Sequence, residues 1–194
     1  MLNEIKKSYL DSLTLFKNYC TNEKEIKETI AAAITIANAF KNKNKVLVAG
    51  NGGSACDAIH FAEEFTGRFR KNRKPLPVIP LTDSAHITAV SNDFGFEEIF
   101  ARDVEAYGMK DDILIAISTS GNSENIIKAV DKAKELGLKT IALLGRDGGK
   151  LKGQCDHEFI IPGNTSDKIQ EIHMVILHII IEGVERILFK ENYL

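Results

Sequence analysis

From residue 45 onward, short runs rich in Val, Ile and Leu alternate with longer segments whose apolar residues recur at helical spacing. Near-continuous apolar strands separated by helices indicate a parallel sheet that is covered by helices on both faces. The strand-like runs are residues 45–50, 77–81, 113–118, 140–144 and 158–161, and the helix-like segments between them are 54–68, 96–107 and 122–136. The predicted fold class is therefore α/β, with a doubly wound, five-stranded parallel sheet.

Further helices flank this alternating region. Two amphipathic helices, residues 3–20 and 23–43, precede the sheet, and a long apolar helix that begins near Thr165 follows it. Together they carry more apolar surface than one face of a sheet needs. This excess predicts a helical interface between chains.

The composition limits the domain count and the location. The chain has 194 residues, 44% of them hydrophobic, and no linker-like stretch. We therefore expect a single domain over residues 1–194, with oligomerisation helices in 1–43 and the α/β sandwich in 45–194. The N-terminal segment lacks the apolar core of a signal peptide, and no run approaches the length of a bilayer span. A cytoplasmic protein without a membrane partner is expected.

Charge and cysteine content exclude other classes. The net charge of −2 and the pI of about 6.2 give no general basic field, so no nucleic-acid partner is expected. The basic cluster at 68–74 is interpreted as a solvated or ligand-facing loop, in which Arg68 could reach a phosphate. Cys20, Cys56 and Cys155 are scattered without a CxxC spacing, so we expect them to be reduced.

Two loops rich in glycine and serine directly follow two of the predicted strands. They are GlyAsnGlyGlySer at 50–54 and SerThrSerGlyAsnSer at 118–123. In the strand order 2-1-3-4-5, which we assume from the habit of flavodoxin-like folds, these two strands are neighbours at the point where ligands bind. Both loops would then face helix N-termini with free backbone N–H groups, an arrangement that holds a phosphate.

The first loop alone is weak evidence for a ligand. Its glycines allow a close backbone approach to an anion, but they are equally typical of a tight strand-to-helix turn. SerAlaCysAsp at 54–57 has the form of a capping box, which predicts Ser54 as the N-cap of the following helix.

The second loop is more specific. Four hydroxyl side chains surround Gly121, and hydroxyls beside helix N-terminal amides suit a phosphate monoester. These four are Ser118, Thr119, Ser120 and Ser123. Helix capping accounts for one or two of them but not for all. The loop also lacks the lysine of a nucleotide P-loop.

Two helices carry side chains suited to acid–base or metal chemistry. His60 and Glu64 lie four residues apart on one helix face, where they form either a functional pair or an ordinary exposed contact. Gln170 and His178 lie on the late apolar helix, where polar side chains need partners. For His178 a core histidine bonded to backbone is the alternative, and His173 is predicted to be such a residue.

Three segments carry a resemblance to a known family. They are HisPheAlaGluGlu at 60–64, AsnAspPheGlyPheGluGluIlePheAlaArg at 92–102 and IleGlnGluIleHis at 169–173. With the two loops, they make the chain resemble the phosphoheptose isomerases, members of the sugar isomerase (SIS) superfamily, over nearly its whole length.

The resemblance implies a set of site residues. Glu64 and His178 would be the catalytic pair. The residues implied to bind substrate are Asn51, Gly52, Gly53, Ser54, Glu64, Asn92, Asp93, Ser118, Thr119, Ser120, Ser123, Asp167 and Gln170. Family members can hold a zinc ion, and the matching ligand positions are His60, Glu64, Gln170 and His178.

The resemblance also implies an activity and an assembly. The reaction would convert sedoheptulose 7-phosphate to D-glycero-D-manno-heptose 7-phosphate through an enediol, for bacterial surface heptose biosynthesis. Glu64 would act on the carbon-bound proton and His178 on the oxygens. The assembly would be a homotetramer with active sites between subunits.

Two other hypotheses stay open on the sequence alone. The chain could be a non-catalytic SIS module, either a sugar-phosphate sensor or an adaptor for a replication initiator, although such a module needs neither Glu64 nor His178. It could also isomerise a different sugar phosphate, because the motifs do not fix the chain length of the sugar.

Overall fold

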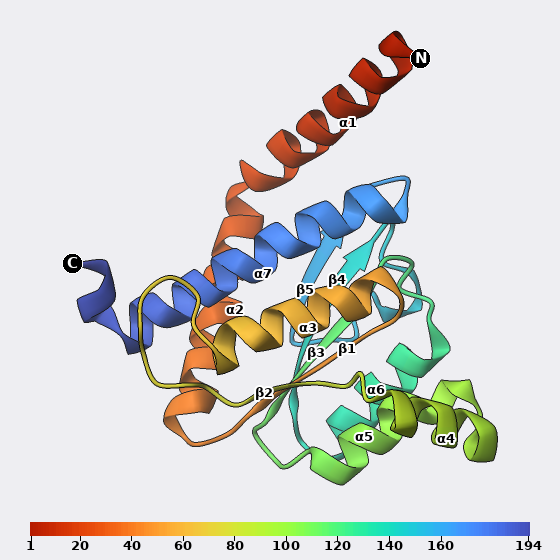
Figure 1. The fold of residues 1–194 in the computed structure, drawn as a ribbon, viewed down its shortest axis with the longest axis vertical. Coiled ribbons are helices and arrows are strands. Elements are labelled where there is room, and N and C mark those ends of the chain that lie inside the picture. Colours follow the sequence, from red (N-terminus) through yellow and green to blue (C-terminus); the bar gives the residue numbers. More distant parts are fainter.

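The computed structural model describes all residues from 1 to 194 and contains one five-stranded, all-parallel sheet (Figure 1). The strands are β1 (Val46–Gly50), β2 (Val78–Pro80), β3 (Ile113–Ser118), β4 (Lys139–Gly145) and β5 (His157–Ile161). Their order in the sheet is β2-β1-β3-β4-β5, so the predicted fold class and strand order are confirmed. Gly50 pairs with Ile117, and strands β1 and β3 therefore end at the same edge.

The chain forms seven α-helices. They are α1 (Leu2–Cys20), α2 (Glu23–Lys41), α3 (Gly53–Thr66), α4 (Ser84–Phe94), α5 (Ile99–Tyr107), α6 (Glu124–Glu135) and α7 (Ser166–Leu188). Short 3₁₀ turns lie at Phe96–Glu98, Gly149–Leu151 and Lys190–Tyr193. Helix α1 projects from the body of the molecule, and α3 runs beside α7 (Figure 1). None of these helices combines the length and the apolar content that a bilayer span requires.

Each face of the sheet has its own apolar core. In β3, Ile113, Ile115 and Ile117 pack with residues of α2, α3 and α7, whereas Leu114 and Ala116 pack with residues of α4, α5 and α6. All five side chains are buried. Burying an Ile or Leu fully contributes about 1.5–3 kcal/mol, which explains why both faces of each strand are apolar.

Helix α4 and the start of α5 were not predicted correctly. Residues 84–94 form a helix with a single buried residue, Val90, so the segment has no apolar stripe that periodicity could detect. Its N-cap is Asp83, whose side chain accepts a hydrogen bond from the backbone N–H of His86 at 2.7 Å. The predicted helix 96–107 begins with a 3₁₀ turn and becomes α-helical at Ile99.

His173 is a core residue, as predicted. It is fully buried in α7, and its Nε2–H donates to the carbonyl of Leu144 at 3.0 Å. The other ring nitrogen, Nδ1, has no hydrogen-bond partner. A protonated ring would therefore place an uncompensated charge in the core.

We expect this histidine to make the protein less stable in acid. Burial lowers the pKa of His173 from its usual value of 6.5 to about 4. As the pH falls, the imidazole of His173 takes up a proton in the unfolded chain before it does so in the folded protein. The contribution of the neutral His173 to the free energy of unfolding is therefore complete above the pKa of the unfolded chain and is lost as the pH falls toward the pKa of the folded protein. The expected loss is about 3 kcal/mol.

Urea unfolding of the wild type and of His173→Gln at about pH 7 and about pH 4.5 checks this expectation. Gln keeps a donor for Leu144 but does not titrate. The wild type should lose more stability than the variant between the two conditions. Equal losses in the two proteins would show that His173 is not the cause.

Candidate active site

The two predicted loops lie side by side, because they leave the neighbouring strands β1 and β3 at one edge of the sheet. A reciprocal amide pair joins them. Nδ2 of Asn51 donates to Oδ1 of Asn125, and Nδ2 of Asn125 donates to Oδ1 of Asn51, both at 2.9 Å. Asn125 is buried in the first turn of α6 and was missed in the sequence, where only its place beside Ile126 on the apolar face of an amphipathic helix marks it.

Two of the four hydroxyls of the second loop face each other, and the other two make exposed contacts. The Ser118 and Ser123 Oγ atoms lie 3.1 Å apart, and the backbone N–H of Gly121 donates to Ser118 Oγ at 3.2 Å. Thr119 Oγ1 lies 3.1 Å from Oγ of Ser166 on α7. Ser123 is the N-cap of α6 but makes no side-chain capping bond. The loop therefore gathers hydroxyls at a helix N-terminus, where an anion is stabilised.

A turn of glycines after β4 supports this loop. Gly121 has a φ of +63°, and a Cβ atom there would lie 1.9 Å from the carbonyl oxygen of Gly148. A Cβ at Gly149 would lie 2.5 Å from the carbonyl oxygen of Ser120. The two backbone segments pack so closely that side chains are excluded from both, which fixes the shape of the hydroxyl loop.

The predicted capping box at the start of α3 is wrong. The N-cap is Gly52, with a φ of +54°, and the helix begins at Gly53. Ser54 is buried, and its Oγ accepts a hydrogen bond from Nε2 of Gln170 at 3.2 Å. The glycine turn brings the chain into the helix early, so the hydroxyl of Ser54 faces α7 instead of capping.

Asp57, the other half of that predicted box, lies buried one turn before His60. Its Oδ2 has no hydrogen-bond partner. Burial raises the pKa of Asp57 to about 6, and the nearby His60 opposes this rise. Asp57 is therefore a desolvated carboxyl beside the site and not a helix cap.

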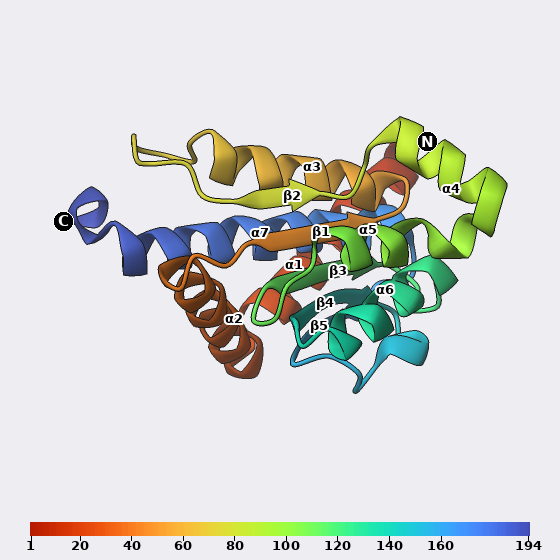
Figure 2. The same cartoon turned by 90° about the horizontal axis from the view of Figure 1, so that it is seen from below.

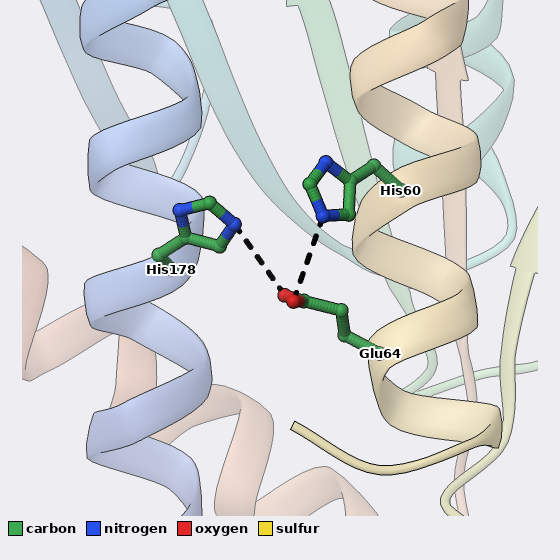
Figure 3. A group of neighbouring side chains, drawn as sticks. All are labelled: His60, Glu64 and His178. Atoms are coloured by element: carbon green, nitrogen blue, oxygen red, sulfur yellow. Dashed lines mark ion pairs between the residues drawn. The ribbon is translucent and has the colours of Figure 1, made fainter. Parts of the chain in front are cut away.

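Helices α3 and α7 bring three predicted site residues together. Nε2 of His60 lies 3.5 Å from Oε1 of Glu64, and Nε2 of His178 lies 3.6 Å from Oε2 of Glu64. Figure 3 shows the two imidazoles and the carboxylate pointing toward one another across the space between the helices. One ligand atom from each residue lies within 4.8 Å of the others. His178 is half-buried and so is not the core histidine that stood as its alternative.

This cluster fits a metal ion or a proton-transfer site. Glu64 Oε2 is buried and has no hydrogen-bond partner, which is costly for a carboxylate unless a cation or a substrate group completes it. Two imidazoles and a carboxylate are ordinary zinc ligands. Gln170 makes no hydrogen bond with these three residues, and its side chain lies against Gly53, where a Cβ atom would be 2.7 Å from it.

The remaining predicted substrate residues lie around this edge. Asn92 and Asp93 are near the end of α4, where Nδ2 of Asn92 donates to Oδ1 of Asp93 at 2.8 Å. No hydrogen bond joins either of them to the other predicted residues. Figure 2 shows α4 at the same end of the molecule as the first turn of α3. Asp167 lies in the first turn of α7, and the Thr165 hydroxyl holds the pKa of its carboxyl below the usual range.

Known proteins resemble this chain in both sequence and fold. The SIS domain family model matches residues 8–145. A phosphoheptose isomerase of Fusobacterium nucleatum subsp. nucleatum is 62% identical over 186 residues, covering 96% of each chain.

Two solved structures of similar proteins have the same fold as this chain. A phosphoheptose isomerase from Francisella tularensis has a TM-score of 0.89 at 39% identity, covering 95% of this chain and 98% of its own. One from Neisseria gonorrhoeae has a TM-score of 0.88 at 37% identity, covering 95% of this chain and 99% of its own.

Proposed function

Because the chain belongs to the SIS domain family and, within it, to the phosphoheptose isomerases, we propose that it interconverts sedoheptulose 7-phosphate and D-glycero-D-manno-heptose 7-phosphate. It is an aldose–ketose isomerase, and its product serves heptose biosynthesis for the bacterial surface. The observation that carries the proposal is the convergence of His60, Glu64 and His178 within 4.8 Å, on helices that begin beside a hydroxyl-rich anion loop. A sensor or adaptor module would need no such cluster.

The substrate would bind with its phosphate in the second loop. Ser118, Thr119, Ser120 and Ser123 supply hydroxyls there, and α6 supplies free N–H groups at its N-terminus. The sugar would extend from the loop along α3. The residues proposed to line it are Asn51, Gly52, Gly53, Ser54, Asn92, Asp93, Asp167 and Gln170.

Glu64 and His178 would move the protons. Glu64 takes a proton from C1 of the ketose, and the C1–C2 double bond of the enediol forms as the C2 carbonyl oxygen takes a proton from a ring nitrogen of His178. His178 then removes the proton from the C1 hydroxyl, and Glu64 returns its proton to C2 to give the aldose. The ring and the carboxylate lie 3.6 Å apart, so both can contact the two adjacent reacting carbons.

We further propose that the site binds zinc through His60, Glu64, Gln170 and His178. The unpartnered Glu64 Oε2 and the two imidazoles facing it support this assignment. When bound, the ion would act as a Lewis acid that stabilises negative charge on the substrate oxygens.

Replacing His60 by Ala should lower the affinity for Zn²⁺ by more than the roughly 10–100-fold that loss of an outer-shell partner costs, since it removes a direct ligand. Glu63→Gln is the matched control, because Glu63 is exposed and its carboxylate lies 4.0 Å from His60 outside the cluster. Competition with a chromogenic chelator measures the zinc affinity of both variants. Unchanged affinity in His60→Ala would remove His60 from the ligand set.

A homotetramer with active sites between subunits and a cytoplasmic location belong to the same proposal. Large apolar side chains exposed on α1, among them Tyr9, Leu13 and Phe16, support burial against other subunits. The three free cysteines accord with a reducing compartment. A monomeric mass in sedimentation at micromolar protein would contradict the assembly.

Proton NMR of sedoheptulose 7-phosphate incubated with the protein tests the reaction. The anomeric signal of the aldose should appear, and it should appear faster with added zinc than with a chelator. The same experiment with pentose and hexose phosphates distinguishes a different sugar isomerase. Absence of any aldose, with folded and oligomeric protein, would favour a sensor or adaptor instead.

A further inference from the structure

The segment between α3 and β2 contacts α7 along its length. The ring of Phe69 stacks on the imidazole of His178, with 5.9 Å between centroids. Further along, Arg70 pairs with Glu182 at 2.8 Å, and Arg73 pairs with Glu185 at 2.7 Å. In Figure 1 this segment is the yellow loop beside the C-terminal half of α7.

Arg73 is the buried member of this basic cluster, which the sequence indicated to be a solvated or ligand-facing loop. Its side chain is 1% exposed and that of Glu185 is 0% exposed. Oε2 of Glu185 accepts a second hydrogen bond, from the hydroxyl of Tyr193 at 2.8 Å. A charge pair so deep in the protein persists only when its remaining donors and acceptors are satisfied.

The other donors of Arg73 reach the end of α3. Nη2 donates to the carbonyl of Glu64 at 2.6 Å, and Nη1 donates to the carbonyl of Phe65 at 2.7 Å and to that of Gly67 at 3.2 Å. The carbonyls of Glu64 and Phe65 belong to the last turn of α3 and that of Gly67 to its C-cap, where they lack helical partners and where a positive charge is stabilised. One planar guanidinium thus caps α3 and pairs with α7 at once.

We propose that Arg73 is a positioning residue for the reaction: by binding the backbone of Glu64 and the carboxylate of Glu185, it sets the spacing of α3 and α7 at which the Glu64 carboxylate meets His178. Glu185 lies two helical turns after His178, so the connection is adjacent to the cluster. The phosphate loop lies at the other end of these helices. The role of the His60, Glu64 and His178 cluster in catalysis rests on the proposed function. The expected effect of Arg73 on the zinc affinity of the cluster can be measured without turnover.

The test compares Arg73→Lys with Arg70→Met. Lys keeps the positive charge near Glu185 but lacks the planar guanidinium that donates to α3 and α7 at once. A shift of the catalytic groups by about 1 Å can lower the rate on the order of 10²-fold. We expect kcat to fall about 10–100-fold with KM for the sugar phosphate changed less than about threefold. Zinc affinity should fall about 10–100-fold, as for loss of other outer-shell partners.

Arg70→Met removes an ion pair to the same helix from the same segment, but Arg70 donates to no carbonyl of α3 and is half exposed. It should leave kcat and zinc affinity within about twofold, as is usual for surface pairs. If Arg73→Lys does not fold, Tyr193→Phe removes only the hydroxyl that holds Glu185. That variant should then weaken zinc binding and kcat by a few-fold in the same direction.

Wild-type zinc affinity and kcat in a folded Arg73→Lys protein would overturn the proposal. So would equal losses in Arg73→Lys and Arg70→Met, because a merely structural pairing with α7 would affect both. A wild-type protein that binds zinc without isomerising the heptose phosphate would refute the proposed function, and the zinc comparison would still decide the role of Arg73.

Discussion

Glu64→Gln should lower kcat by about 10²–10⁴-fold while the protein remains folded. Gln has the shape of Glu but cannot accept the proton from C1 of the substrate. The fold should tolerate the change, because Glu64 Oε2 makes no hydrogen bond that Gln would break. Steady-state kinetics with sedoheptulose 7-phosphate, together with circular dichroism, measure both effects.

Glu63→Gln is the control for this prediction. Glu63 is the neighbouring carboxylate on α3, and its side chain is 62% exposed, compared with 14% for Glu64. The control should retain turnover within about twofold, as surface substitutions do. Zinc content must be measured in Glu64→Gln, because Glu64 is also a proposed zinc ligand and a carboxylate bound to a metal is a poorer base. The measurement separates loss of the base from loss of the metal. Near-normal turnover with zinc still bound would refute Glu64 as the base.

Gly121→Ala should lower kcat/KM by about 10²-fold, mainly through a higher KM. The added Cβ would lie 1.9 Å from the carbonyl oxygen of Gly148, so either the hydroxyl loop or the turn after β4 has to move. Alanine also pays for the positive φ of +63°, roughly 1–2 kcal/mol. Kinetics and inhibition by inorganic phosphate report whether the anion site is lost.

Gly153→Ala separates the effect of backbone strain from the effect of the steric clash. Gly153 has a φ of +77°, but a Cβ there would meet no atom within 4 Å. This variant should lose a similar amount of stability from backbone strain and keep its kcat/KM. If Gly121→Ala binds phosphate and substrate like the wild type, the loop at 118–123 does not form the phosphate site.

Much of the fold could be predicted because its signals are local. Strands buried on both faces must be apolar on both faces, as in Ile113–Ser118, and this makes them visible in the sequence. The strand order was assumed from flavodoxin-like folds, and the positions of the two glycine and serine loops follow from that assumption. His60 and Glu64 could be paired from their spacing alone, since helix geometry places them on one face.

The features that were missed depend on contacts between distant segments. No local pattern distinguishes Arg73 from its solvated neighbours, because its burial depends on Glu185, which lies 112 residues away. The same holds for Asn125, whose partner is 74 residues away. Ser54 has the sequence of a cap, but the glycine turn before it and Gln170 opposite it decide its role.

The most direct test of the account is isomerisation of sedoheptulose 7-phosphate in D₂O, followed by NMR. A proton carried by the Glu64 carboxylate can exchange with solvent between the two carbons, so deuterium should enter C2 of the aldose, and both turnover and labelling should be lost in Glu64→Gln. Aldose formed and labelled by Glu64→Gln at the wild-type rate would contradict proton transfer by Glu64.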